Sequence, residues 1–345
     1  MEDATFAMKT PAALLALVLL AGCSSGPKEP DPEKLLDLYM TTATYLYQDE
    51  SYVRAQDQAV KALKIDPQNE PMRKMIGWIR LRMGRVEDLL IAEDFFEQLS
   101  REDPSNAAVL LGLASSQERL GVAYDEAARE ITSDERYTEA VDPEARSADL
   151  FERSRAYWRR SKANYEKVLS GPTAKIKAMN GLQRVAALLG DYDESLTWSK
   201  RLLESSRAEL AGWRNTMRSR DLTDTEERVA RRSEEAAIEL QVDTHLFAST
   251  MLRKLGRNDE ALVHMDGAIA LTPNEPQVYS LRAQLRSDVG DHAGGIEDID
   301  RYLRYSQEEF AHPNIRRAYD LRTFCEREME RLAREKFLEA ASADN

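Results

Sequence analysis

From residue 33 onward, apolar residues recur at intervals of three and four, and polar residues occupy most of the positions between them. This spacing places the apolar side chains on one face of an α-helix. No stretch shows the alternation of apolar and polar residues, rich in β-branched side chains, that is typical of a strand. The pattern therefore predicts an all-α protein.

The helical pattern also repeats along the chain. The stretches LLGDYDESLTWSKRLLES at 188–205 and KLGRNDEALVHMDGAIALTP at 254–273 share one order of residues. Each has a leucine, a glycine, several polar residues, a small residue and then apolar positions at helical spacing. Gly256 and Gly290 lie 34 residues apart. A fixed period of this length indicates stacked helical hairpins.

These segments resemble tetratricopeptide repeats (TPRs), whose period is about 34 residues. The resemblance covers most of residues 33–310, and it implies a TPR-like helical-hairpin solenoid that forms a right-handed superhelix. Steps of about 34 residues predict a turn in each hairpin. These turns fall at Glu50, Gly84, Gly121, Gly190, Gly256 and Gly290, with two turns that lack glycine near Arg155 and Thr223.

Each hairpin has residue types that suit its geometry. Glycine permits the left-handed backbone of the turn, and proline stops the second helix before the next hairpin begins. A small residue on the second helix lets the two backbones approach closely. Because one hairpin cannot bury its own apolar face, stacked hairpins create the core. The prolines are Pro67, Pro104 and Pro273, and the small residues are Ala55, Ala92, Ser195, Ala261 and Gly295.

Three regions depart from the repeat. Extra residues after Gly84 predict a longer second helix there, and Thr223 or Asp224 suits the N-cap of a helix. Residues 122–169 are an insertion, in which Thr132–Asp142 predicts a loop and Glu144–Leu169 one long helix. The segment 313–345 predicts a charged C-terminal capping helix and tail. Its apolar stripe consists of Leu321, Cys325, Met329 and Leu332.

The composition agrees with a folded helical protein and limits its partners. The chain has 345 residues, of which 32% are charged and 42% hydrophobic. A formal net charge of -13 argues against general affinity for nucleic acid or anionic lipid. In the basic and aromatic stretch at 153–167, helical spacing places Tyr157, Ser161 and Val168 on one side and the arginines around the rest, which favours a packed helix with a solvated face over a binding patch. We expect no nucleic-acid partner.

An apolar run from Ala12 to Ala21 follows Lys9 near the N-terminus. As a helix the run would extend about 15 Å, roughly half the hydrocarbon core of a bilayer. It is too short to span a membrane and has the proportions of the apolar region of a secretory signal. Glu2 and Asp3 are unusual before such a region, which favours Met8 over Met1 as the start without deciding between them.

The end of this run, Leu20, Ala21, Gly22 and Cys23, resembles the lipobox of bacterial lipoproteins. The resemblance implies that the Cys23 thiol receives a diacylglyceryl group and that cleavage makes Cys23 the first residue of the mature protein. Ser24 after the cysteine implies, in the enterobacterial members, transfer to the outer membrane. We therefore expect a lipid-anchored protein of the bacterial envelope that faces the periplasm.

These observations divide the chain into six segments. The predicted organisation is a signal peptide at 1–22, a lipidated cysteine and tether at 23–32, TPR-like hairpins at 33–121, the insertion at 122–169, further hairpins at 170–312 and the capping helix and tail at 313–345.

No residues form a recognisable catalytic or metal-binding motif. The sequence lacks HExxH, GxGxxG, the phosphate loop GxxxxGK and GxSxG. His245 is expected to be an interior histidine and Cys325 a core residue of the capping helix. The four histidines are scattered, with no partner at metal-ligand spacing. We therefore expect no enzymatic activity, no cofactor and no metal.

In the TPR family, the first helix of each hairpin lines a groove that takes extended peptides or partner helices. The resemblance places three helical faces in this groove, where charge-assisted hydrogen bonds would hold a carboxylate. Trp78 is either an exposed anchor or a hairpin core residue. The candidate groove residues are Lys74, Trp78 and Arg82; Lys177, Asn180 and Arg184; and Asp243, Leu246, Thr250 and Arg253.

The sequence therefore predicts a membrane-anchored TPR-like scaffold for protein or peptide partners in the bacterial envelope, with a role in assembly, secretion, or pilus or barrel biogenesis. One alternative is an adaptor or module of a cell-wall or envelope enzyme, with a cleft built by residues 122–169. Another is a soluble TPR co-chaperone whose N-terminus only imitates a signal peptide. The sequence specifies neither the partner nor the oligomeric state.

Overall fold

The computed structural model describes residues 31–133, 142–218 and 222–343, and every regular element in these ranges is an α-helix. The all-α prediction is therefore confirmed for this part of the chain. The lipobox residues Leu20 to Cys23 lie outside the described residues. The chain forms two compact units, one that ends at Met72 and one that begins at Arg73 within α3.

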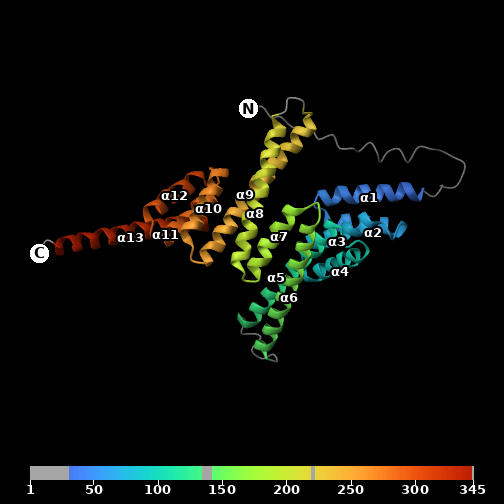
Figure 1. The fold of residues 1–345 in the computed structure, drawn as a ribbon, viewed down its shortest axis with the longest axis horizontal. Coiled ribbons are helices and arrows are strands. Elements are labelled where there is room, and N and C mark those ends of the chain that lie inside the picture. Colours follow the sequence, from blue (N-terminus) through green and yellow to red (C-terminus); the bar gives the residue numbers. More distant parts are fainter. Residues whose placement is uncertain (1–30, 134–141, 219–221, 344–345) are drawn as a thin grey trace. The chain divides into compact units, whose positions relative to one another are not determined.

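The helices pair mainly with their neighbours in sequence, as expected for a hairpin array (Figure 1). The first unit contains α1 (Pro32–Gln48) and α2 (Tyr52–Ile65). The helices that follow are α3 (Glu70–Met83), α4 (Val86–Glu102), α5 (Ala107–Ser133), α6 (Pro143–Ser170), α7 (Lys175–Leu188), α8 (Tyr192–Met217), α9 (Asp224–Lys254), α10 (Asn258–Leu271), α11 (Pro276–Asp288), α12 (His292–Tyr305) and α13 (Pro313–Ala343).

Five predicted turns are confirmed by their left-handed backbone. In the turn between α1 and α2, the amide of Ser51 donates to the carbonyl of Leu46 at 2.9 Å, the bond that closes a Schellman turn. This turn has a glutamate at the left-handed position, where the other four turns have glycine. Glycine adopts positive φ more easily because it has no β-carbon. The five φ angles are 58° at Glu50, 78° at Gly84, 86° at Gly190, 72° at Gly256 and 83° at Gly290.

The helix ends and small residues also agree with the prediction. Helices α2, α4 and α10 end two residues before Pro67, Pro104 and Pro273. The longer second helix after Gly84 is confirmed, because α4 has 17 residues and α2 has 14. Small side chains fill the hairpin contacts, since Ala55, Ala92, Ser195 and Ala261 have no exposed surface.

The predicted turns at Gly121 and near Arg155 are wrong, because both residues lie inside long helices. Helix α5 has 27 residues and α6 has 28, about twice the 14 residues of α7. The long helix expected at Glu144–Leu169 is confirmed by α6, but the predicted boundary between residues 121 and 122 falls within α5. In the part of the insertion that the structure describes, the additional sequence lengthens one hairpin and forms no further one.

A close-packed seam explains how this long hairpin is held. Ser147, Ser154, Ser161 and Val168 are buried at seven-residue intervals along α6, the spacing of a coiled-coil contact. The Ser161 hydroxyl donates to a backbone carbonyl of α5 at 2.8 Å, and the Ser147 hydroxyl donates to another at 2.9 Å. These bonds satisfy the buried hydroxyls and bring the two helices close together.

Gly121 has a packing role in the same seam. A β-carbon at Gly121 would lie only 2.3 Å from Nε1 of Trp158, which is almost fully buried on α6. Glycine is therefore required here by the close approach of the indole ring. The repeat pattern predicts a turn at Gly121 because it does not reveal this contact with Trp158.

The predicted hairpin turn near Thr223 needs a similar correction. Thr223 is confirmed as an N-cap, because its hydroxyl accepts from the Glu226 amide at 3.3 Å and Glu226 accepts from the Thr223 amide at 2.8 Å. However, the residues on either side belong to α8, with 26 residues, and α9, with 31. They extend two neighbouring hairpins and form none of their own.

The apolar stripe of α13 is covered over only part of its length. Cys325 is fully buried, and its Sγ lies 3.6 Å from the Ser287 hydroxyl, which confirms its predicted core position. Met329 and Leu332, farther along the stripe, are 41% and 36% exposed. The predicted stripe is therefore a core contact only in the first half of the helix.

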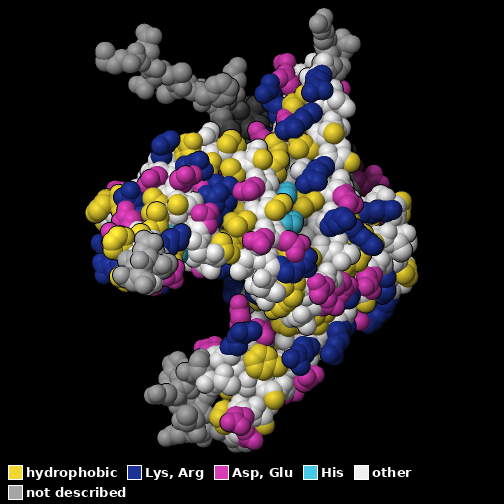
Figure 2. Space-filling view, turned by 60° about the vertical axis from the view of Figure 1, so that its left-hand side comes forward, with side chains coloured by type: hydrophobic (Ala, Val, Ile, Leu, Met, Phe, Trp, Pro, Cys, Tyr) yellow, Lys and Arg dark blue, Asp and Glu magenta, His cyan; other side chains and the backbone are white. Residues whose placement is uncertain are grey.

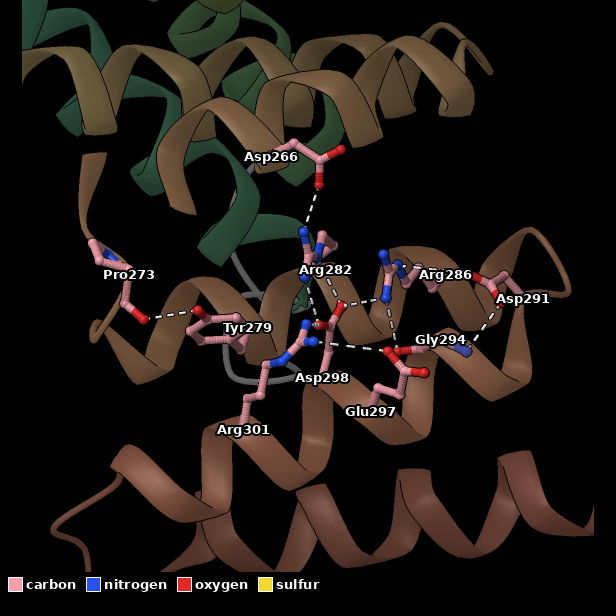
Figure 3. Close-up of polar contacts among 10 residues, drawn as sticks. All are labelled: Asp266, Pro273, Tyr279, Arg282, Arg286, Asp291, Gly294, Glu297, Asp298 and Arg301. Carbon is pink, nitrogen blue, oxygen red and sulfur yellow. Dashed lines mark hydrogen bonds and ion pairs between the residues drawn. The ribbon is translucent and has the colours of Figure 1, made fainter. Parts of the chain in front are cut away.

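A buried ion network joins α10, α11 and α12 (Figure 3). Asp298 of α12 has no exposed surface and accepts from Nε and Nη2 of Arg282 at 2.8 and 2.6 Å. Arg286 and Arg301 each place Nη1 3.2 Å from the same carboxylate. Arg282 also reaches Asp266 of α10. One carboxylate thus holds three guanidinium groups, a feature that the sequence pattern does not reveal.

Candidate functional site

A hollow of about 770 Å³ lies where α5, α7 and α9 approach one another. Small and apolar side chains form most of its wall, and polar groups from α7, α8 and α9 complete it. We call it the α5/α7/α9 groove. The lining consists of Ala107, Ala108, Leu111, Pro172, Thr173, Ala174, Lys175, Ile176, Lys177, Asn180, Glu209, Ser233, Ala236, Ala237 and Leu240.

Helix α7 brings the polar side of this groove into place. It contacts α5, α6 and α8, and Figure 1 shows it between the long hairpin and α8. A β-carbon at Gly181 would lie 2.2 Å from Cζ of Tyr165 on α6. The absence of a side chain at Gly181 therefore lets α7 pack directly against the phenol ring.

The start of α7 gives the groove a positive end. Ala174 is the N-cap residue and contributes no side-chain hydrogen bond to the first amides of the helix. Lys175 and Lys177, both exposed, follow at once. The helix dipole adds partial positive charge at the same end. This arrangement suits an acidic or carboxylate group of a ligand that lies along the apolar wall.

Of the ten predicted groove residues, the structure places Lys177 and Asn180 in this hollow. The Oδ1 atom of Asn180 accepts from Nε2 of Gln183 at 2.9 Å, and this bond leaves its amide donors available. The three-residue spacing therefore brings a cation and an amide to the same wall.

Arg184 lies on the same helix but is already engaged within the chain. Its Nε and Nη2 donate to Glu118 at 2.6 and 2.9 Å, and the Tyr165 hydroxyl donates to the same carboxylate at 2.8 Å. Burial, together with the negative charge of Glu118, raises the pKa of Tyr165. This bidentate pairing connects α5 to α7, so Arg184 has a structural role in the packing.

The first predicted face lies away from the groove. Trp78 is half-buried and packs edge to face on Phe96, with ring centroids 5.2 Å apart. It contacts two clusters of buried side chains, which favours the interpretation as a core residue over that as an exposed anchor. Lys74 is half-buried and Arg82 is exposed, and neither lines the groove.

The third predicted face lies farther along α9 than the groove. Leu246 packs against the core of the neighbouring hairpin, and Thr250 donates to its carbonyl at 3.0 Å. Arg253 pairs with Asp288 at 2.7 Å, while Asp243 is exposed. The groove is instead lined by earlier residues of α9, between positions 233 and 240. These helical turns exist because α9 begins well before the point where a standard repeat would start. The signal in the sequence that could have identified this wall is the run of small and apolar residues at helical spacing, Ser233, Ala236, Ala237 and Leu240.

Two histidines that are distant in sequence meet in the structure. The Nδ1 atoms of His245 and His264 lie 3.1 Å apart, and His245 is buried as predicted. Burial, followed by the charges of His264 and Arg207, lowers the pKa of His245 to about 4. A β-carbon at Gly267 would lie 2.5 Å from Cε1 of His245, so this glycine makes room for the ring.

The described residues contain neither a cluster of metal ligands nor a helix that could span a membrane. In residues 31–133, 142–218 and 222–343, no three histidine, cysteine or acidic side chains come together in a way that would hold a metal ion. Over the same ranges, no helix combines the length and the apolar character needed to cross a bilayer.

The surface mixes charges of both signs. On the face drawn in Figure 2, basic and acidic side chains are interspersed and hydrophobic side chains lie among them.

Comparison with solved structures returns helical repeat proteins. TTC0263, a thermophilic TPR protein of Thermus thermophilus, is 16% identical over 72% of this chain and 98% of its own, with a TM-score of 0.44. YrrB, a TPR protein with an unusual peptide-binding site, is 13% identical over 76% and 97%, with a TM-score of 0.41. PilF of Pseudomonas aeruginosa is 10% identical over 87% and 93%, with a TM-score of 0.33. No family model and no curated protein sequence matches the chain.

Proposed function

We propose that this protein is a lipid-anchored scaffold that binds an extended peptide segment of a partner protein in the α5/α7/α9 groove. The observation that carries the proposal is the groove itself, in which an apolar wall faces the lysines at the start of α7. A pocket that is mostly apolar, with a few placed polar groups, is the usual form of a binding site.

The chemistry of the wall supports a peptide as the ligand. Ala107, Ala108, Ala236 and Ala237 are too short to fill the hollow, so they leave space for the side chains of a bound segment. The amide of Asn180 is suited to bind a peptide carbonyl, and Lys177 an acidic side chain. We expect a segment with small or apolar residues and at least one carboxylate.

The anchor is the second part of the proposal. Cys23 within the lipobox-like sequence would carry the lipid, and the protein would face the periplasm from the outer membrane. Growth with labelled palmitate should label the wild-type protein and leave Cys23→Ala unlabelled. A wild-type protein without label would contradict the anchor and favour the soluble co-chaperone alternative.

Photocrosslinking in intact cells tests the groove. Benzoylphenylalanine in place of Lys177 should crosslink to a partner protein. The same crosslinker in place of Arg159, which is exposed on α6 outside the groove, should not. Ala236→Arg should abolish this capture because it fills the hollow with a long charged side chain, whereas Ala236→Ser should preserve it. Equal capture from positions 177 and 159, or capture that survives Ala236→Arg, would refute the peptide-binding role.

The identity of the captured protein decides between the two remaining roles. A structural component of an envelope assembly would support the scaffold. A cell-wall hydrolase whose activity changes on binding would favour the alternative of an enzyme adaptor.

A further inference from the structure

A second hollow, of about 360 Å³, lies beside the C-terminal part of α8. Arg207 and Arg214 of α8 line it, together with Arg218, the residue that caps the C-terminus of α8. At about 100° per residue, these three positions fall within about 40° of one another around the helix axis. Gln241 of α9 and Leu271 of α10 complete the wall. We call it the α8 arginine hollow.

The charge of this hollow differs from that of the chain. The protein has a net charge of -13, yet no acidic residue is among the described residues that line the hollow. Arg214 is paired with Glu234 at 2.8 Å. In the described ranges, Arg207 makes no hydrogen bond or ion pair, and the guanidinium of Arg218 has only a 3.5 Å contact with Asn215. Among the residues that the structure describes, these two guanidinium groups therefore have no carboxylate partner.

Gln241 provides independent evidence for a ligand. Its side chain is only 2% exposed, and Nε2 has no hydrogen-bond partner within the described chain. A buried donor without a partner destabilises the folded chain. An oxygen atom bound in the hollow would satisfy this donor.

We infer that the α8 arginine hollow binds the carboxylates of an acidic peptide segment. Guanidinium groups hold carboxylates through two parallel hydrogen bonds, and the Gln241 amide would supply a further donor. Leu210, Ala211 and Leu271 offer an apolar surface to the aliphatic part of a glutamate side chain. The inference is independent of the α5/α7/α9 groove, which shares no lining residue with this hollow.

Fluorescence anisotropy with labelled hexaglutamate tests the inference on the full-length protein in detergent. The double variant Arg207→Ala/Arg218→Ala should weaken binding by at least about tenfold, because it removes the two unpaired guanidinium groups. Arg159→Ala/Arg232→Ala removes the same charge from exposed positions outside the hollow and should weaken binding by less than about twofold. Equal weakening by both double variants would show general charge attraction and overturn the site.

Gln241→Leu separates ligand binding from a structural role. This variant removes the unpaired buried donor, so its melting temperature should equal or exceed that of the wild type, while its hexaglutamate affinity falls severalfold. A lower melting temperature with unchanged affinity would overturn the role of Gln241 in binding. Titration with inorganic phosphate and with vesicles of anionic lipid tests the other sources of anions. Binding of either that depends on Arg207 and Arg218, without binding of hexaglutamate, would overturn the assignment to an acidic peptide.

Discussion

Replacement of Asp298 by asparagine tests the buried network that joins α10, α11 and α12. The substitution preserves the shape of the side chain and removes its charge. Arg282 is 6% exposed, so its guanidinium cannot recover the lost interaction from water. Burial by itself would lower the pKa of Arg282, but the hydrogen bonds and charges of Asp298 and Asp266 raise it overall. Asp298 is thus the buried partner on which the charged form of Arg282 depends.

The magnitude follows from the contacts that are lost. Asp298 accepts two short hydrogen bonds from Arg282, and hydrogen bonds to charged groups are worth about 1.5–3 kcal/mol each. Removal of one partner of a buried ion pair costs about 3–5 kcal/mol in total. Asp266→Asn is a matched control that affects the same arginine. Because the Asp266 side chain is 61% exposed, its loss should cost less than about 1 kcal/mol.

Urea unfolding followed by circular dichroism at 222 nm gives the required comparison. Asp298→Asn should lower the midpoint clearly, and Asp266→Asn should leave it near that of the wild type. Hydrogen exchange should locate the early opening in α10–α12, since neighbouring hairpins of a repeat protein are coupled mainly through shared contacts. Equal shifts of the midpoint by the two variants would refute the role of Asp298 in stability. So would a shift by Asp298→Asn equivalent to less than about 0.5 kcal/mol, which is the range of ordinary surface substitutions.

Three further predictions concern stability. Gly181→Ala should lower the melting temperature, because the new β-carbon would lie 2.2 Å from the ring of Tyr165. Gly212→Ala, at a position with open space around it, should leave the melting temperature unchanged or raise it. Equal effects of the two substitutions would contradict this packing. The pKa of His245 is lowered to about 4, so the unfolded chain binds more protons than the folded chain between about pH 6.5 and 4. The free energy of unfolding should therefore decrease as the pH is lowered through that range. Thermal melts at pH 7 and 5.5 should show a loss of order 1 kcal/mol that His245→Phe reduces, and an equal loss in both proteins would disprove this assignment. Thr223→Ala should cost about 1 kcal/mol in urea unfolding through loss of the capping box, and an unchanged midpoint would count against the cap.

The fold was predictable wherever local chemistry determines the chain path. The turns at Gly190, Gly256 and Gly290 follow from the left-handed backbone that the sequence requires there. Gly121 was misleading because glycine serves both turns and close contacts. Only the position of Trp158, which is distant in sequence, decides between the two.

The candidate sites were less predictable because they depend on which helices meet. Lys177 and Asn180 follow from their spacing on one helix, but the facing wall comes from a part of α9 that a standard repeat would lack. Arg184 has the residue type of a binding group, yet its pairing with Glu118 joins positions 66 residues apart. Periodicity within a helix carries no information about such pairings.

The seam of the long hairpin has a consequence for how that hairpin opens. The large buried side chains Trp158 and Tyr165 lie in the second half of α6, whereas the first turns contribute the small buried Ser147, whose hydroxyl donates to the carbonyl of Ala128. Less apolar area is therefore lost when the end near Ser147 separates. The tip of the hairpin around Ser147 should therefore unfold locally before the rest, with backbone amides near Ala128 exchanging long before those beside Trp158.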